Sequence, residues 1–147
     1  MNGEEKTNGR IHKIGAVFFA LWGIFHIGVS VFALIAVIGG GGAAFLELLG
    51  TESPPLLAVT SAVMAQHLWN LTWIGALVLF VAIKYNWRNS REGYWLNLTV
   101  ASAAELGSVV ALIAPGYIPL LENLGGPIIW ALAVIFATIG FLREPTT

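Results

Sequence analysis

The sequence predicts an all-α integral membrane protein, a four-helix up-down-up-down bundle with both termini in the cytoplasm. Its composition, its four long apolar runs and the placement of its basic residues predict this fold. Hydrophobic residues make up 57% of the 147 residues and charged residues only 10%, and the mean hydropathy is +0.81. Soluble domains carry about 25% charged residues, so this composition is typical of a chain that is immersed in lipid.

Four apolar runs are long enough to be membrane spans, because a helix needs about 20 apolar residues to cross the hydrocarbon core of a bilayer. Short polar or Gly/Pro-rich segments separate the runs, and connections of that kind make successive helices antiparallel neighbours. The predicted spans are about residues 14–38, 56–83, 94–114 and 126–142, and we expect residues 1–147 to form a single transmembrane domain.

The first and third loops between these spans predict short amphipathic segments. Residues 43–50 carry Glu47, and residues 118–124 carry Glu122. Both segments combine leucines with a carboxylate, which is a composition suited to the boundary between lipid and water. We expect both segments to lie along the outer surface of the membrane.

Every basic residue falls on one side of the predicted topology, in the N-terminal tail, the loop after the second span or the C-terminal tail. Because loops rich in Lys and Arg stay in the cytoplasm, we expect both termini there. The expected location of this multi-pass chain is a bacterial cytoplasmic (inner) membrane. The seven basic residues are Lys6, Arg10, Lys13, Lys84, Arg88, Arg91 and Arg143.

Net charge and cysteine content exclude several classes of site. The formal net charge of -1 argues against nucleic acid as a partner, because that function requires a basic patch. The absence of cysteine excludes disulfides, CxxC redox chemistry and thiolate-held metals, so any cofactor must be held by His, Glu or amide groups. The expected partners are the lipid bilayer and a lipophilic small molecule. The sequence is also compatible with a homo-oligomer or a larger membrane complex.

The stretch Val63–Gly75 places several polar side chains inside an apolar span, with the sequence V-M-A-Q-H-L-W-N-L-T-W-I-G. Such side chains are costly in lipid and usually face a partner, a cavity or a ligand. At 1.5 Å of rise per residue, His26, His67 and Glu105 fall within about 4 Å of a common depth in three different spans. The sequence therefore predicts a midplane His/His/Glu polar site, with these three residues as its catalytic groups.

Other residues on the same helix faces are predicted to line this site, because positions three and four apart share a face. Tryptophan rings would supply apolar walls, and Ser, Asn and Gln would supply hydrogen bonds, which is the usual combination in a ligand pocket. The predicted ligand-binding residues are Trp22, Ser30, Gln66, Trp69, Asn70, Trp73 and Ser102.

Four interpretations of the polar site are compatible with the sequence. The first is structural packing in an accessory subunit of a larger complex, where hydrogen bonds between helices fix their register. The second is a pocket for a small lipophilic ligand or substrate, with His and Glu as acid-base or anchoring groups. The third is a metal centre on His26, His67 and Glu105, or haem b held by the two histidines. The fourth is a proton or ion pathway. We favour the ligand pocket, and the sequence alone leaves open whether the chain is an enzyme.

Overall fold

A computed structural model describes residues 10–40, 58–119 and 121–143. Within these ranges every regular element is helical and no strand is present. Four helices are long, and a 3₁₀ helix, a π-helical turn and a second 3₁₀ helix occupy the connections. In chain order the elements are α2 (Ile11–Gly40), α4 (Ala58–Lys84), η1 (Asn86–Arg88), α5 (Arg91–Ser108), η2 (Val109–Ile113), η3 (Leu121–Asn123) and α6 (Gly125–Arg143).

All four long helices are long and apolar enough to cross a membrane, with mean hydropathies from 1.5 to 2.3 over their most apolar stretches. The prediction of an all-helical chain with four such helices is therefore confirmed for the described residues. In the third loop, the described part of the expected amphipathic segment contains the short η3 helix. The expected amphipathic segment at residues 43–50 lies outside the described residues.

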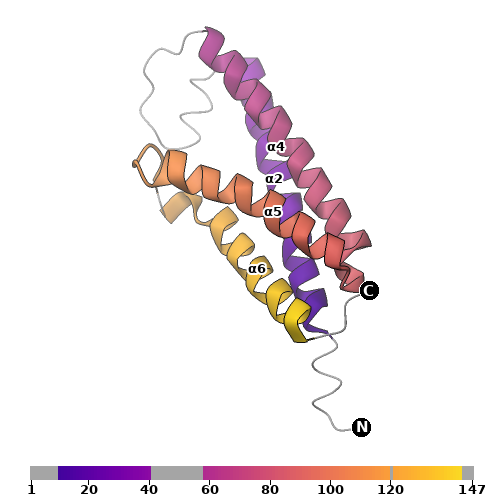
Figure 1. Ribbon diagram of the computed structural model, residues 1–147. Helices are drawn as coiled ribbons and strands as arrows, with labels where there is room; N and C mark the ends of the chain where they lie inside the picture. Colours follow the sequence, from indigo (N-terminus) through magenta and orange to yellow (C-terminus); the bar gives the residue numbers. More distant parts are fainter. Residues whose placement is uncertain (1–9, 41–57, 120, 144–147) are drawn as a thin grey trace, which may run out of the picture.

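α2 is the helix on which the other helices are assembled. It packs along α4 and along α6, and α5 in turn packs against both of those helices. α2 and α5 therefore face each other across the bundle, with α4 and α6 at the sides (Figure 1). A long side chain on α5 that points inward is consequently aimed at α2.

α2 and α4 approach each other closely at a pair of glycines. A Cβ atom on Gly23 would lie 2.6 Å from the carbonyl oxygen of Gly75, and one on Gly75 would lie 2.9 Å from that of Gly23. Only residues without a side chain let two helix backbones meet at this distance. Further along, the hydroxyls of Ser30 and Thr72 are 2.8 Å apart. Together these contacts fix the register of the two helices.

α2 and α6 meet in the same way at the other side of α2. A Cβ atom on Gly15 would lie 2.5 Å from the backbone nitrogen of Ala137, and one on Gly140 would lie 2.7 Å from the backbone of His12. The beginning of α2 therefore lies against the end of α6. The main apolar core fills the space between the helices around this contact, and its buried residues are Phe19, Trp22, Val78, Ala82, Tyr94, Ala101, Ala133 and Ala137.

Polar side chains hold the turn between α4 and α5. Ser90 caps α5, because its hydroxyl accepts a hydrogen bond from the backbone N–H of Gly93 at 3.2 Å. The buried Asn97 donates from Nδ2 to the carbonyl oxygen of Val78 at 3.2 Å, and its amide lies 3.0 Å from that of Asn86. These contacts tie the first turns of α5 to the end of α4.

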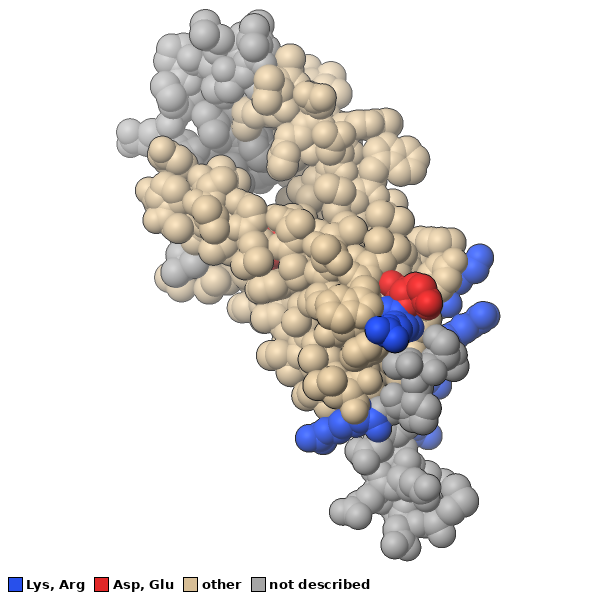
Figure 2. Space-filling view, in the orientation of Figure 1, with Lys and Arg blue, Asp and Glu red and all other residues tan. Residues whose placement is uncertain are grey.

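Basic side chains gather at one end of the molecule, where α2 begins and where α4 and α6 end (Figure 2). Figure 2 shows a long tan surface above this end, without Lys or Arg. The basic residues of the described chain are Arg10, Lys13, Lys84, Arg88, Arg91 and Arg143.

Candidate functional site

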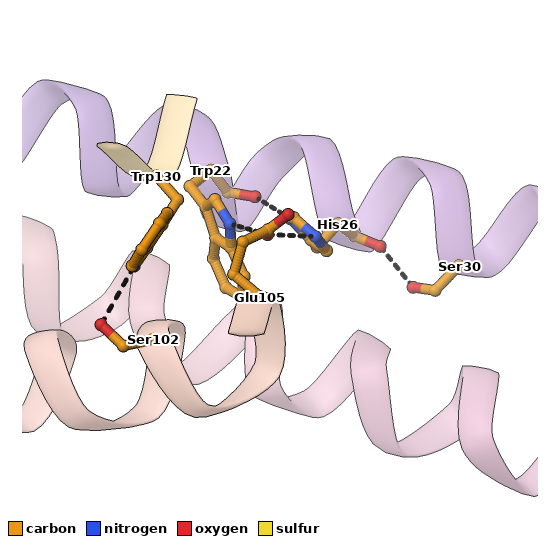
Figure 3. Close-up of polar contacts among 6 residues, drawn as sticks. All are labelled: Trp22, His26, Ser30, Ser102, Glu105 and Trp130. Atoms are coloured by element: carbon orange, nitrogen blue, oxygen red, sulfur yellow. Dashed lines mark hydrogen bonds and ion pairs between the residues drawn. The ribbon is translucent and has the colours of Figure 1, made fainter. Parts of the chain in front are cut away.

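Trp22 and His26 of α2 meet Glu105 of α5 in the interior of the bundle (Figure 3). The indole Nε1–H of Trp22 donates to Glu105 Oε2 at 2.8 Å, and His26 Nε2 lies 3.5 Å from the same oxygen. The Glu105 side chain is 2% exposed and that of His26 is 13% exposed. An ionisable pair is thus enclosed within two of the helices that can span a membrane.

The two aromatic rings of this cluster stack on each other. Trp22 and His26 are four residues apart, which places them on one face of the helix. Their ring centroids are 3.8 Å apart, with 29° between the ring planes, and Phe25 meets the imidazole edge-on at 5.3 Å. This stacking restricts the imidazole orientation and points its Nε2 atom at α5.

The hydrogen bond at the other ring nitrogen determines where the protons of His26 can be. His26 Nδ1 lies 2.9 Å from the carbonyl oxygen of Trp22. A carbonyl oxygen can only accept a hydrogen bond, so Nδ1 carries the hydrogen. In the neutral imidazole, Nε2 is then an acceptor, and it faces an oxygen of Glu105.

The pair His26–Glu105 therefore favours one additional proton. Without it, two acceptor atoms would face each other at 3.5 Å, and a carboxylate would be buried without a cation, which is costly. With a proton on Nε2 the pair is an ion pair, and with a proton on the carboxyl both groups are neutral. In both forms one exchangeable proton lies between α2 and α5.

Gly126 of α6 closes the cluster on a third side, and the sequence analysis did not identify it as a site residue. A Cβ atom at this position would lie 3.0 Å from Glu105 Oε1, 3.2 Å from Oε2 and 3.3 Å from His26 Cε1. The only available signal was the Gly125–Gly126–Pro127 sequence at the start of the fourth span. A Gly–Gly–Pro sequence indicates a helix start, and it does not indicate which carboxylate the glycine would meet.

The two predicted serines lie one turn from the ionisable pair. Ser30 is buried; its hydroxyl bonds to the backbone carbonyl of His26 and contacts Thr72 of α4. Ser102 accepts a hydrogen bond of 3.0 Å from Nε1 of Trp130 on α6 (Figure 3). Both hydroxyls join neighbouring helices around the pair, and neither contacts the imidazole ring or the carboxyl group.

The predicted site residues of α4 do not join this cluster. Gln66, His67 and Asn70 are exposed on the outer surface of the helix. Trp69 and Trp73 are 55% and 61% exposed, respectively, and their rings contact each other edge-to-face at 6.0 Å. These five side chains, which were expected at the centre of the site, therefore face away from the bundle, whereas Thr72 and Gly75 of the same stretch contact α2.

Helix register explains why the expected common depth is not found. Ser30 lies opposite Thr72, and α2 and α4 run in opposite directions, so His26 lies at the level of about Ala76. His67 is nine residues before Ala76 in α4, which places it about 14 Å from the level of His26 at 1.5 Å per residue. The predicted depths assume that the middles of the helices lie at the same level, whereas the close contact between Gly23 and Gly75 sets the actual register of α2 and α4.

This placement also bears on the metal and haem interpretations. The described residues contain no group of three or more His, Asp or Glu side chains that could hold a metal ion. His26 faces Glu105 inside the bundle, while His67 is exposed on the outer face of α4. The structure thus brings together two of the three proposed ligands, and it does not direct the two imidazoles at a common centre.

Comparisons of the chain with protein family models, with curated proteins and with solved structures found no match. The chemistry of the cluster is inferred from its geometry. A His–Glu pair that holds one mobile proton can act as a general acid when it gives the proton up and as a general base when it takes one. The imidazole of His26, at 13% exposure, is the more accessible member of the pair.

Proposed function

We propose that this chain is a multi-pass protein of a bacterial cytoplasmic (inner) membrane, with an up-down-up-down bundle and both termini in the cytoplasm. The gathering of Lys and Arg at the end where α2 begins and α6 ends supports this orientation (Figure 2). The contact between His12 and Gly140 supports placing the beginning of α2 and the end of α6 on one side of the membrane.

The absence of native cysteine makes this orientation testable with single cysteines in intact cells. Arg91→Cys lies at the basic end, and Tyr117→Cys lies in the exposed turn after η2. A membrane-impermeant maleimide should label Tyr117→Cys from outside and should label Arg91→Cys only after the membrane is opened. The reverse pattern, or labelling of both from outside, would refute the orientation.

We propose further that the Trp22–His26–Glu105 cluster binds a small lipophilic ligand or substrate and exchanges a proton with it. One observation carries this proposal: His26 Nε2 and Glu105 Oε2 face each other at 3.5 Å while Nδ1 is already bonded to a carbonyl. The pair thereby holds a transferable proton where water is scarce. A ligand that reaches it through apolar spans must itself be lipid-soluble.

The chemistry of the pair defines the ligand group that it fits. A carbonyl oxygen can accept a hydrogen bond from the proton of the pair, and it takes that proton only in a step that places negative charge on the oxygen; a hydroxyl group can return the proton in the reverse step. After donation, His26 is neutral and Glu105 is a carboxylate, and the Trp22 N–H at 2.8 Å remains to stabilise the negative charge. A binder would use the proton as a hydrogen bond, and an enzyme would transfer it during turnover.

The competing function is structural, in an accessory subunit of a larger membrane complex. Two bonds between helices favour it: Trp22 to Glu105 at 2.8 Å and Trp130 to Ser102 at 3.0 Å. Such bonds can serve only to fix helix crossings, because each contributes modestly to the stability of a membrane bundle.

Glu105→Gln separates the two functions. The glutamine side chain has the same size, and its carbonyl oxygen can still accept from the indole N–H of Trp22, so the hydrogen bond that joins the two helices remains. We expect the free energy of unfolding to change by no more than about 1 kcal/mol, while the exchangeable proton is lost. Glu92→Gln is the matched control, because it makes the same change at an exposed position of the same helix.

Native mass spectrometry of protein extracted with its surrounding lipid measures the outcome. A ligand-binding function predicts that wild type and Glu92→Gln retain a small molecule other than bilayer lipid and that Glu105→Gln loses it. If Glu105→Gln retains the same molecules as wild type, or wild type carries none, the structural function is the correct one.

A further inference from the structure

Six residues of α4 form an exposed stripe along the helix that no described part of the chain covers. The spacing between them alternates between three and four residues, which is the pattern of a helix seam that packs against another helix. All six are exposed, and they lie within the segment Ser61–Arg88 that can span a membrane. The residues of this α4 stripe are Val63, Gln66, Asn70, Trp73, Leu77 and Phe80.

Two members of the α4 stripe are amides, which is costly for a surface that faces lipid. Within the part of the chain that the structure describes, neither the Gln66 nor the Asn70 side chain makes a hydrogen bond. Polar side chains in membrane spans almost always face a protein partner or a water-filled cavity. The α4 stripe therefore has the composition of a helix interface.

We propose that the α4 stripe is the contact surface for a second copy of this chain, giving a two-fold dimer in which α4 packs against α4. Two copies in one membrane share the same orientation, so their two-fold axis lies along the membrane normal. Each residue of the stripe then meets its own copy at the same depth. Only side chains that are complementary to themselves suit such a contact.

The chemistry of the stripe meets this requirement. An amide carries both donor and acceptor groups, so Asn70 can bond to Asn70 of the second copy, and Gln66 can do the same. A charged residue would repel its own copy, and the sequence from Ser61 to Ile83 contains none. A single Asn in such a seam also fixes the register of the two helices.

This dimer is independent of the proposed function of the His26–Glu105 pair. The α4 stripe points outward, whereas Leu68, Gly75 and Val78 on the opposite face are buried. The dimer can therefore form whether or not the pair binds a ligand, and loss of one property leaves the other measurable.

Cysteine cross-linking in native membranes tests the dimer directly, because the chain contains no cysteine of its own. Val63→Cys and Leu77→Cys place a thiol at two levels of the stripe, and Ile35→Cys places one at an exposed position of α2. Mild oxidation should give a covalent homodimer with both α4 variants and not with the α2 variant. Both α4 positions are exposed, so neither substitution disturbs the interior.

A second measurement uses energy transfer between differently labelled copies in liposomes. Asn70→Leu removes the amide bond across the dimer and makes the monomer surface compatible with lipid, so we expect dimerisation to weaken roughly 3-fold or more. Unchanged or stronger dimerisation of Asn70→Leu, equal cross-linking at Ile35→Cys, or cross-linking of the α4 variants only to a different protein would each overturn the proposal.

Discussion

The substitution Gly23→Ala tests the glycine contact that sets the register of α2 and α4. The added methyl carbon would lie 2.6 Å from the carbonyl oxygen of Gly75 and 3.0 Å from the backbone nitrogen of Leu79, whereas ordinary van der Waals contact begins at 3.4 Å. Backbone atoms cannot turn aside as a flexible side chain can, so the two helices must move apart by most of 1 Å. Overpacking of this kind costs about 1–3 kcal/mol.

Gly28→Ala is the matched control on the same helix, because a Cβ atom there has nothing within 4 Å. Alanine is favoured over glycine in a helix by about 0.5–1 kcal/mol, and this gain is common to both substitutions. The difference between the two variants therefore isolates the steric cost, which we expect to be about 1–3 kcal/mol in favour of Gly28→Ala.

Unfolding by increasing mole fractions of sodium dodecyl sulfate in mixed micelles, followed by tryptophan fluorescence, measures this difference. The buried Trp22 lies one residue before Gly23, so its emission should also shift in the folded state of Gly23→Ala. Coincident unfolding curves for Gly23→Ala and Gly28→Ala would contradict the reasoning, since the helix contact would then tolerate a side chain.

Three further substitutions test other contacts. In Gly126→Ala the added methyl group meets the end of the flexible Glu105 side chain at 3.0 Å. The free energy of unfolding should therefore fall by less than about 1 kcal/mol, and the infrared band of the Glu105 carboxyl group should shift. An unshifted band would contradict the placement of α6. Asn97→Leu removes the donor to a backbone carbonyl of α4 and leaves buried polar groups unpaired. The free energy of unfolding should fall by about 1–3 kcal/mol in the same assay. An unchanged free energy of unfolding would contradict the role of this hydrogen bond. Trp130→Phe should lower the free energy of unfolding by about 0.5–1.5 kcal/mol. Ser102→Ala should add little to this loss in a double-mutant cycle, because the two residues share one hydrogen bond. Full additivity of the two losses would show that the hydrogen bond contributes nothing.

Composition and span length predicted the helices well. Each predicted span corresponds to a described helix, and the boundaries differ mainly because the helices continue into the flanking polar residues. α2 begins at Ile11 and α5 begins at Arg91, both ahead of the apolar runs used to predict them. The backbone of a helix is satisfied by its own hydrogen bonds, so its existence depends on local sequence.

Part of the site was predictable for the same reason. Trp22 and His26 are four residues apart, so any helix places them on one face, and the depth of Glu105 in the third span favoured a contact with that face. His67 was misplaced, because its depth relative to His26 depends on the register of two helices. The contact of Gly126 with Glu105 was likewise not predictable from the sequence, because it joins residues 21 positions apart.

The sequence by itself determined four apolar helices and the helix face shared by Trp22 and His26, because each of these is a property of one segment. The order of basic and non-basic connections along the chain also predicted the end of the molecule that carries the basic residues. Only the tertiary structure decided that Glu105 pairs with His26 and that the polar residues of α4 face outward. The physical reason is that close contacts between glycines and backbone atoms set the sliding and rotation of one helix against another. Those contacts depend on two segments at once, and neither segment alone contains the information.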